Sequence, residues 1–443
     1  MIVGNYARHD PCAAAANKEE AFAMTTWFDT ARFGMFVHWG HSSQQGIELS
    51  WPLVGGHAAL PQCTQVPVEQ YHASAASFDP KAYDPRAWAQ QAKRAGMQYA
   101  VFTTKHHDGY AMYDTQQSDF SVMHSPYGRD IFRQFADAMR EEGIRVGVYF
   151  SLIDWHHPDY PAFTQADAPY VAGRWPRPDP DRWPRFTDFM FAQVRELLTN
   201  YGTIDIIWFD GGWERSIDQW RAKDLEAMIR ELQPDILIND RLPGGGDYAT
   251  PEQFVPAQPP AGPWECCMTI NESWGYNPTD THYKSARQLV HSLCEIAGKG
   301  GNFLLNVSPM GDGALQPELA ERLGVIEEWM RKNAESITGT MPGLEPWQCY
   351  APSTRRGDTA YVHLLMRPYD TVTVRGIRTK RVKSVRALAS GAPLDFETRC
   401  SIVDQLINPD PIGELTITVP STEIDDYATV LAIEFTPEAM RNA

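Results

Sequence analysis

The sequence lacks the features that mark nucleic-acid-binding and membrane proteins. No run of five or more basic residues occurs, and 39 lysines and arginines stand against 56 acidic residues, which gives a formal net charge of −17. Such a balance repels polyanions and anionic lipid surfaces. No stretch approaches the roughly eighteen uninterrupted apolar residues that a membrane-spanning helix needs. We therefore expect neither nucleic acid nor a membrane as a partner.

Paired cysteines and a recognisable leader are also missing. The seven cysteines are odd in number and show no CxxC spacing, which favours reduced thiols over a disulfide framework. They are Cys12, Cys63, Cys266, Cys267, Cys294, Cys349 and Cys400. The segment MIVGNYARHD has no basic stretch followed by an apolar core. We expect a cytoplasmic protein, or a periplasmic or secreted one if a signal peptide has been removed.

A series of short apolar runs is present between residues 33 and 308. The runs are rich in Val, Ile, Phe and Tyr and alternate little, which is typical of parallel strands covered on both faces. They span residues 33–39, 98–104, 145–151, 204–210, 235–240, 264–270 and 302–308. Helical patterns that end near Gly or Pro separate several of them, at residues 85–96, 130–143, 186–202 and 220–234.

This alternation of strand and helix patterns indicates βα units. No glycine-rich phosphate loop follows the first strand, as it would in a dinucleotide-binding sheet. The number of strands favours a (β/α)8-like TIM barrel, either regular or with one irregular strand or helix. We expect this catalytic barrel over residues 1–343, with a last helical pattern at 315–337.

From about residue 345 the pattern changes to strict alternation of apolar and polar residues between turn clusters. Examples are AYVHLLM, TVTVRG, VKSVRAL, ELTITV and ATVLAIEF, and no helical pattern lies among them. We expect residues 344–443 to form a C-terminal antiparallel β-sandwich that packs on the barrel.

Polar and aromatic residues gather where the apolar runs of the predicted barrel end, which is where TIM barrels build their active sites. These residues are His38, Trp39, His106, His107, Tyr149, Asp154, Trp155, Trp208, Asp210, Asn239, Asp240, Arg241, Glu252, Glu265 and Trp274. Aromatic faces, imidazoles, a guanidinium and paired carboxylates are what a sugar-cleaving cleft requires. Asp210 ends the buried run IDIIWFD, a rigid mount for a catalytic nucleophile.

Several of these residues also have a purely structural interpretation. Asp210 is suited to cap a following helix. His106 and His107 are adjacent, so on a strand they would face opposite ways and one of them could be structural. Arg241 could pair with Asp240 or Asp247 at the rim, an arrangement that contributes little.

Seven segments, in order and at similar spacing, resemble the family 29 α-L-fucosidases. They are FGMFVHWG (33–40), TKHHDGYAMYDT (104–115), WFDGGW (208–213), NDR (239–241), YATPEQ (248–253), WECCMTINESWGYN (264–277) and GKGGNFLLNVSPMGDG (298–313). The resemblance covers about residues 24–343, and the tail matches the family's β-sandwich in kind. It implies a retaining exo-α-L-fucosidase that needs no metal or other cofactor and cleaves terminal fucose from an oligosaccharide or glycoconjugate.

The resemblance also implies roles for individual residues. Asp210 would be the nucleophile, and Glu252 is the favoured acid/base because its Pro- and Gly-rich loop can reach over the mouth of the site. Glu265, at the start of an apolar strand, stays an alternative for that role and a candidate for substrate contact. The residues expected to contact or enclose the fucose are His38, His106, His107, Tyr149, Trp208, Arg241 and Trp274.

The loop after the first strand departs from the family pattern. Many relatives carry an adjacent Glu-Trp pair there, whereas Glu48 and Trp51 are separated in GIELSWPLVGG (46–56). We still expect both to contribute to substrate binding. The loops at 41–77 and 156–185 are expected to face the leaving group, and the sequence makes no prediction of linkage preference or oligomeric state.

Two other functions are compatible with the same residues. A metal-dependent barrel hydrolase could use the histidines together with Asp210, although HWGH and HH differ from the usual HxH and HExxH ligand spacings, and sensitivity to a chelator would identify it. A non-catalytic carbohydrate-binding protein could have kept the barrel. The presence of both candidate carboxylates argues against that alternative.

Overall fold

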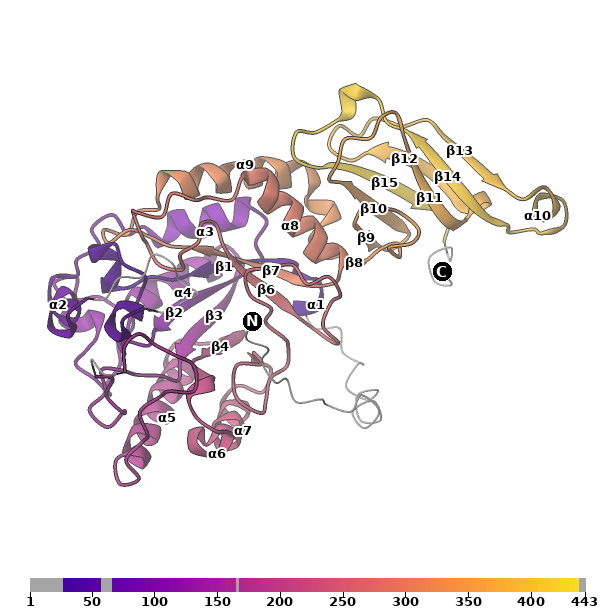
Figure 1. The fold of residues 1–443 in the computed structure, drawn as a ribbon. Coiled ribbons are helices and arrows are strands. Elements are labelled where there is room, and N and C mark those ends of the chain that lie inside the picture. Colours follow the sequence, from indigo (N-terminus) through magenta and orange to yellow (C-terminus); the bar gives the residue numbers. More distant parts are fainter. Residues whose placement is uncertain (1–26, 57–65, 165–166, 438–443) are drawn as a thin grey trace.

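The structure, a computed structural model, describes residues 27–56, 66–164 and 167–437. Cys12, Cys63 and the N-terminal segment considered above lie outside the described residues. Two lobes lie side by side, a barrel of strands surrounded by helices and a β-sandwich formed by the C-terminal part of the chain (Figure 1). In the described part, no helix has both the length and the apolar composition that crossing a membrane would demand.

All seven predicted strands of the barrel are confirmed, and they form one curled parallel sheet in the order β5-β4-β3-β2-β1-β7-β6 (Figure 1). The strands are β1 (Phe33–Val37), β2 (Tyr99–Lys105), β3 (Arg145–Ser151), β4 (Ile206–Asp210), β5 (Leu237–Ile238), β6 (Glu265–Thr269) and β7 (Asn302–Val307). Their residues are almost all buried, which explains why the sequence shows little alternation.

An irregular segment joins the two edge strands β5 and β6. Parallel bridges pair Asn239 with Tyr248, Ala249 with Trp264 and Glu252 with Cys267. Pro251 lies inside this segment and has no N–H to donate to a ladder, so a regular eighth strand cannot form. The barrel is therefore of the irregular kind allowed by the sequence, and the irregular segment carries Glu252.

Helices cover the outside of the sheet. The predicted helices are confirmed as α3 (Pro85–Arg94), α4 (Ile131–Glu141), α5 (Trp183–Asn200), α7 (Ala222–Leu232) and α9 (Pro317–Asn333). The sequence patterns did not single out α8 (Ala286–Gly298), which the Ser285 side chain caps. Shorter elements are α1 (Phe28–Ala31), α2 (Val68–Ala73), α6 (Ile217–Trp220), η2 (His41–Gln45), η3 (Trp51–Val54) and η6 (Gly212–Glu214).

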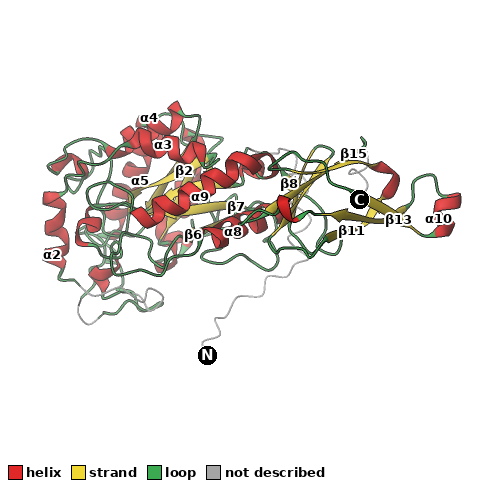
Figure 2. Ribbon diagram, turned by 90° about the horizontal axis from the view of Figure 1, so that it is seen from above, coloured by secondary structure: helices red, strands yellow, loops and turns green. Residues whose placement is uncertain are grey.

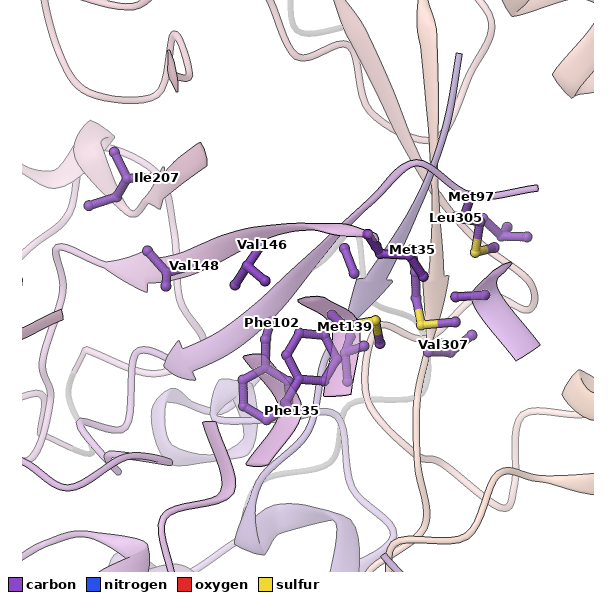
Figure 3. Close-up of a cluster of buried hydrophobic side chains, with 14 of the residues drawn as sticks. Met35, Met97, Phe102, Phe135, Met139, Val146, Val148, Ile207, Leu305 and Val307 are labelled. Carbon is purple, nitrogen blue, oxygen red and sulfur yellow. The ribbon is translucent and has the colours of Figure 1, made fainter. Parts of the chain in front are cut away.

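The strands present alternate residues to the helices and to the barrel interior. Phe102 of β2 packs on Phe135 of α4, with ring centroids 4.8 Å apart, in the layer between sheet and helices (Figure 3). Phe36, Tyr149 and Trp208 point the other way and form the interior cluster. Because side chains alternate along a strand, the direction of Trp208 also turns Asp210 into the barrel.

The C-terminal β-sandwich is confirmed as two antiparallel sheets with a shared apolar core. Their strand orders are β12-β15-β10-β9-β8 and β11-β14-β13. The strands are β8 (Met341–Pro342), β9 (Ser353–Arg356), β10 (Thr359–Leu364), β11 (Thr371–Arg378), β12 (Val382–Ala387), β13 (Phe396–Cys400), β14 (Ile412–Thr418) and β15 (Thr429–Phe435). The division at residues 343 and 344 stays a prediction, and β8 lies just before it.

One feature of the sandwich contradicts the sequence analysis, which found no helical pattern in this region. A short helix, α10 (Ile402–Ile407), connects β13 to β14, and the Ser401 side chain caps it by accepting a hydrogen bond from the Asp404 backbone N–H. Six residues are too few to display a helical period. The only local signal for this helix was the capping residue Ser401, which a search for periodicity does not detect.

The sandwich packs on the barrel helices α8 and α9 (Figure 2). Trp329 of α9 donates its indole N–H to the Ala428 carbonyl at 2.9 Å, and the His291 ring of α8 lies 2.8 Å from the Tyr427 carbonyl. This contact is on the helical layer of the barrel, so the ends of the strands remain available for a site.

Candidate active site

A pocket of about 330 Å³ lies at the carboxyl ends of the barrel strands, within the usual size range of small-molecule sites. Its lining comprises Phe36, His38, Trp51, His106, Tyr149, Tyr170, Ala172, Trp208, Asp210, Trp213, Arg241, Glu252 and Trp274. The structure thus brings together most of the residues predicted from the sequence. Among the residues predicted to act in catalysis or to contact the sugar, Glu48, His107 and Glu265 are not part of this lining.

Asp210 is the last residue of β4, and its carboxylate is held from two sides. The Tyr149 hydroxyl donates to Oδ2 at 2.8 Å, and Arg241 Nη1 donates to Oδ1 at 3.1 Å. Burial and the neighbouring Asp210 charge raise the pKa of Tyr149, so the phenol keeps the proton that it donates. The carboxylate is therefore fixed in direction, as a nucleophile requires.

Two glycines after Asp210 let the chain turn away sharply from the strand. Gly211 has a φ of +77°, which favours glycine. A Cβ on Gly212 would lie 2.3 Å from the Arg241 carbonyl oxygen. The dipeptide therefore allows Asp210 to end a buried strand while the next loop packs against the turn that carries Arg241.

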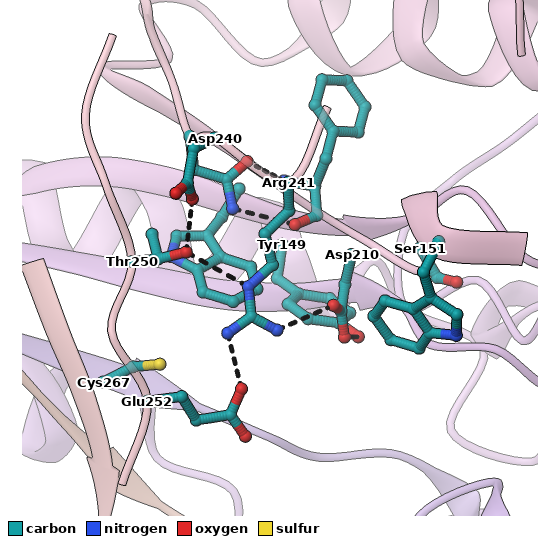
Figure 4. A network of polar contacts seen from close by, with 12 residues as sticks. Tyr149, Ser151, Asp210, Asp240, Arg241, Thr250, Glu252 and Cys267 are labelled. Atoms are coloured by element: carbon teal, nitrogen blue, oxygen red, sulfur yellow. Dashed lines mark hydrogen bonds and ion pairs between the residues drawn. The ribbon is translucent and has the colours of Figure 1, made fainter. Parts of the chain in front are cut away.

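Arg241 links the two candidate catalytic carboxylates (Figure 4). Besides Asp210, its guanidinium contacts Glu252 Oε2 at 2.5 Å through Nη2 and the Thr250 hydroxyl at 3.2 Å through Nε. Burial alone would lower the pKa of Arg241, but the two carboxylates raise it well above its usual value. The rim pairing considered from the sequence does not form, because Asp247 pairs with Arg230 and the Asp240 carboxylate accepts a hydrogen bond from the Thr250 hydroxyl.

Glu252 and Asp210 differ in their exposure to solvent. The Glu252 side chain is 37% exposed, whereas that of Asp210 is 12% exposed. Glu252 lies on the irregular segment beside β6, and Asp210 lies on a regular strand. A carboxyl group at the mouth can exchange protons with water and with a leaving group, as an acid/base must.

Three histidines around the pocket are kept neutral by burial. His38 Nδ1 lies 2.7 Å from Asn306 Oδ1, and burial lowers the pKa of His38 to about 4. Burial likewise lowers the pKa of His106 well below its usual range and that of His107 to about 3. Neutral imidazoles are suited to hydrogen bonds with sugar hydroxyls.

His106 and His107 do not face opposite ways, because β2 ends before them at Lys105. Their ring centroids are 4.1 Å apart in the turn after the strand. The His106 ring bonds Ser50 at 2.5 Å and lines the pocket, while the His107 ring bonds Ser151 at 2.6 Å. His107 Nε2 lies 3.8 Å from Asp210 Oδ2 and has no hydrogen-bond partner among the described residues, so His107 lies beside the candidate nucleophile.

Glu265 is placed away from the pocket, contrary to the predicted substrate contact. It opens β6, at the opposite end of the strand from the site, and it is fully buried. Its carboxyl group accepts hydrogen bonds from the Tyr99 hydroxyl at 2.5 Å and from the Trp208 indole N–H at 2.9 Å. Burial raises the pKa of Glu265 to about 7. It therefore supports Trp208, whose ring lies 4.6 Å from the Arg241 guanidinium.

Glu48 and Trp51 also take different positions. Glu48 is buried and accepts the backbone N–H groups of Trp274 at 2.7 Å and Gly275 at 3.2 Å. Burial raises the pKa of Glu48 to about 8. Trp51 lines the pocket, with its ring centroid 5.2 Å from that of Tyr170. Only Trp51 is placed to touch a ligand, and Glu48 instead fixes the loop that presents Trp274.

Sequence reasoning missed four other side chains of the pocket, which are Phe36, Tyr170, Ala172 and Trp213. Trp213 belongs to the quoted segment WFDGGW, and its place directly after the two glycines was the available signal. Tyr170 comes from the 156–185 loop, which had been expected near the leaving group. Among the residues that the structure describes, no three His, Cys, Asp or Glu side chains converge in a metal-binding arrangement.

Comparisons with known proteins agree on one family. The sequence profile described as Alpha-L-fucosidase matches residues 4–335. The tissue alpha-L-fucosidase of Bos taurus is 30% identical over 376 residues, which cover 78% of this chain and 75% of the bovine protein. The structure of alpha-L-fucosidase isoenzyme 1 from Paenibacillus thiaminolyticus is similar with a TM-score of 0.80 at 40% identity, over 93% of this chain and 98% of that one.

A third relative was trapped during reaction. It is an alpha-L-fucosidase from Bacteroides thetaiotaomicron, solved as a covalent intermediate with 2-fluoro-fucosyl fluoride in a glutamate-to-glutamine mutant. Its TM-score is 0.76 at 25% identity, over 93% of this chain and 95% of that one.

Proposed function

This chain belongs to the α-L-fucosidase family, and we propose that it is a retaining exo-glycosidase that removes terminal α-L-fucosyl residues from oligosaccharides or glycoconjugates. The observation that carries this proposal is the Arg241 guanidinium, which holds the Asp210 and Glu252 carboxylates together in a pocket of neutral histidines and aromatic rings. Retaining glycosidases use two carboxyl groups, one as nucleophile and one as acid/base.

In the first step, Asp210 attacks the anomeric carbon of the fucose. A bond forms between a carboxylate oxygen and that carbon while the glycosidic C–O bond breaks, and Glu252 gives its proton to the departing oxygen. The hydrogen bonds from Tyr149 and Arg241 fix the Asp210 carboxylate during the attack. The trapped intermediate of the Bacteroides relative supports a covalent step of this kind.

In the second step, a water molecule replaces the leaving group. Glu252, now ionised, takes a proton from the water, whose oxygen attacks the anomeric carbon and releases Asp210. Fucose leaves with its original anomeric configuration, because two inversions have occurred. Glu252 regains the proton that it needs for the next cycle.

The remaining pocket residues would bind the sugar. Above a pH of about 4 the His38 ring is neutral, and it and His106 can exchange hydrogen bonds with hydroxyl groups. Trp208 and Trp274 supply flat apolar surfaces for the C–H faces and the methyl group of the fucose. A neutral glycan also agrees with the net charge of −17, which disfavours polyanionic partners.

The two rival functions are less well supported. The rings of His38, His106 and His107 bond Asn306, Ser50 and Ser151, respectively, and no metal-binding cluster occurs among the described residues. A purely carbohydrate-binding role would not require two carboxylates held by one guanidinium, as Asp210 and Glu252 are held by Arg241. We also propose a cytoplasmic location, because the cysteines within the described residues are free thiols.

The decisive experiment follows the hydrolysis of 4-nitrophenyl α-L-fucoside in the presence of excess EDTA, with proton NMR identifying the first anomer of fucose released. Chelator-resistant hydrolysis that yields the α-anomer first would support the proposal. Release of the β-anomer first would contradict the retaining mechanism, and loss of activity with EDTA would favour a metal-dependent hydrolase.

A further inference from the structure

The strand β13 leaves one edge of the C-terminal sandwich open. It pairs with β14 on one side and ends the sheet β11-β14-β13. No described segment pairs with its other side, which lies at the margin of the lobe (Figure 1). The strand contains neither a proline nor a bulge, two features by which proteins commonly block an edge strand. An open edge of this kind can accept a further strand.

The hydrogen-bond pattern of β13 shows which of its backbone groups are unused. The Asp395 carbonyl, just before the strand, accepts the Thr418 N–H at 2.8 Å, so residue 395 faces β14. Because the direction of the backbone groups alternates along an antiparallel strand, residues 397 and 399 also face β14. The N–H and C=O groups of Phe396, Thr398 and Cys400 therefore point out of the sheet, and no described residue bonds them.

Two charged side chains on β13 have no partner. Glu397 and Arg399 are exposed, and neither makes an ion pair or a side-chain hydrogen bond with another described residue. They are two residues apart and so share one face of the strand, while Phe396 on the opposite face packs on the core of the sandwich. Thr398 thus lies midway between an unpaired acid and an unpaired base.

Two copies of β13 are complementary when they run antiparallel about a twofold axis at Thr398. In that register Thr398 lies opposite its own copy, and Phe396 lies opposite Cys400 of the second copy. These are the residues with unused backbone groups, so they can form the hydrogen-bonded pairs of a ladder. Glu397 then lies directly opposite Arg399 in the non-hydrogen-bonded position, where side chains come closest. The twofold axis repeats this pair, so the charges of the edge complement themselves.

The helix α10, which follows β13, supplies apolar surface beside this edge. None of its residues is buried, and it projects from the far end of the lobe (Figure 2). Its apolar side chains are 63–78% exposed, and they are Ile402, Val403, Leu406 and Ile407. In the antiparallel register, α10 of one copy lies beside the residues that lead into β13 of the other. Exposed apolar clusters mark contact surfaces, and this cluster is continuous with the open edge.

We propose that the chain forms a twofold symmetric dimer in which β13 pairs with β13 of a second copy and α10 packs against the start of that strand. The two sheets β11-β14-β13 then become one continuous sheet. The catalytic pocket is in the barrel, so each subunit keeps its own site. This inference is independent of the proposed function.

Charge reversal tests both the surface and its register. Sedimentation velocity at about 1 to 100 µM protein should show a monomer–dimer equilibrium for the wild type, as expected of a small interface. Glu397→Arg places like charges opposite each other at both symmetric positions and should raise Kd by about 10- to 100-fold. Arg399→Glu should do the same. The double variant Glu397→Arg/Arg399→Glu restores opposite charges and should recover the wild-type Kd.

Two further variants complete the test. Asp426→Arg is the matched control, because Asp426 is an exposed acid of the same lobe with no ion pair to a described residue, and its Kd should equal that of the wild type. Thr398→Pro removes the outward N–H at the centre of the proposed ladder without removing a bond to β14, and should abolish the dimer. Thermal unfolding checks that each variant is folded.

A wild type that stays monomeric over this range would overturn the inference, and the charges of β13 would then serve only to protect an edge strand. A dimer or larger assembly that neither reversal weakens would place the contact on another surface, which also overturns it. A double variant that is folded but monomeric would contradict the register centred on Thr398.

Discussion

The carboxyl groups of the barrel interior lie in two layers. In the upper layer, which faces the pocket, Asp210 and Glu252 both bond the Arg241 guanidinium. In the lower layer, Glu265 accepts hydrogen bonds from two neutral groups, the Tyr99 hydroxyl and the Trp208 indole N–H. Both upper carboxylates pair with a cation, and that of Glu252 is partly exposed. The lower one is fully buried, and burial raises its pKa to about 7. A carboxyl group is thus suited to take part in the reaction in the upper layer and to hold a neighbouring side chain in the lower one, because its partners and its burial differ.

The largest expected effect comes from removing the upper carboxylate on β4. Asp210→Ala should lower kcat on 4-nitrophenyl α-L-fucoside by about 10⁴-fold or more, because no other group can form the covalent intermediate. Asp235→Ala, on the exposed turn before β5, serves as the control and should retain wild-type kcat. Residual activity of Asp210→Ala within ten-fold of wild type would assign the nucleophile elsewhere.

The second prediction concerns the upper carboxylate at the mouth. Glu252→Ala should lower kcat/KM on a fucosylated oligosaccharide by about 10²- to 10⁴-fold, the range of general acid–base catalysis. The loss on 4-nitrophenyl α-L-fucoside should be smaller, since nitrophenolate leaves without full protonation. Glu272→Ala, with a side chain 44% exposed, is the matched control. Equal losses on the two substrates would argue against an acid role for Glu252.

Substitution of Glu265 in the lower layer should change the stability of the protein more than its kcat. The pKa of Glu265 is raised from 4.5 to about 7, so between these pH values the folded chain keeps a proton that the unfolded chain releases. The stability contributed by this proton is full below pH 4.5 and is lost as the pH rises through about 7. Relative to Glu265→Gln, the free energy of unfolding of the wild type should therefore fall by on the order of 3 kcal/mol across this window.

Denaturant unfolding of both proteins at several pH values measures this difference, with Glu231→Gln on the exposed surface as the control. The kcat of Glu265→Gln should stay within a few-fold of wild type, because a Gln side chain can still accept a hydrogen bond from Trp208. A loss of kcat as large as that of Glu252→Ala would show that Glu265 takes part in the reaction, which would contradict the difference in role between the two layers.

The smallest effect is expected at Glu48, another buried glutamate near the pocket. Glu48→Gln replaces one of the two oxygens that accept the backbone N–H groups of Trp274 and Gly275. The loop that presents Trp274 should loosen, so KM should rise several-fold with little change in kcat. Steady-state kinetics with 4-nitrophenyl α-L-fucoside measure both constants, and Glu69→Gln on the exposed face of α2 is the control. A fall in kcat with unchanged KM would contradict a positioning role.

Much of the fold could be predicted because buried parallel strands and amphipathic helices have local signatures. All seven apolar runs became strands, and the alternating runs of the tail became a sandwich. The irregular segment between β5 and β6 was not predicted as such, because its pairing depends on residues of other segments that folding brings beside it. The helix α10 was missed because six residues are too few to show a period.

The residues of the candidate site likewise include some that could be predicted from the sequence and some that could not. Residues at the ends of strands, such as His38 and Asp210, were found because strand ends converge in every barrel. The distinct positions of Glu48 and Glu265 were not found, because a sequence shows which residue types are present but not that Trp274 or Trp208 lies between them and the pocket. Trp213 became visible only when its exposure and its bond to Tyr170 were known.

The sequence by itself determined the barrel, the sandwich and the family, since hydrophobic period and motif order are properties of the chain read in one dimension. Only the tertiary structure decided which carboxylates lie beside Arg241 and which are buried against neutral donors. It also decided that Trp213 lines the pocket. The physical reason is that pKa, pairing and exposure depend on groups brought close by folding, and these groups come from segments that are far apart in the sequence.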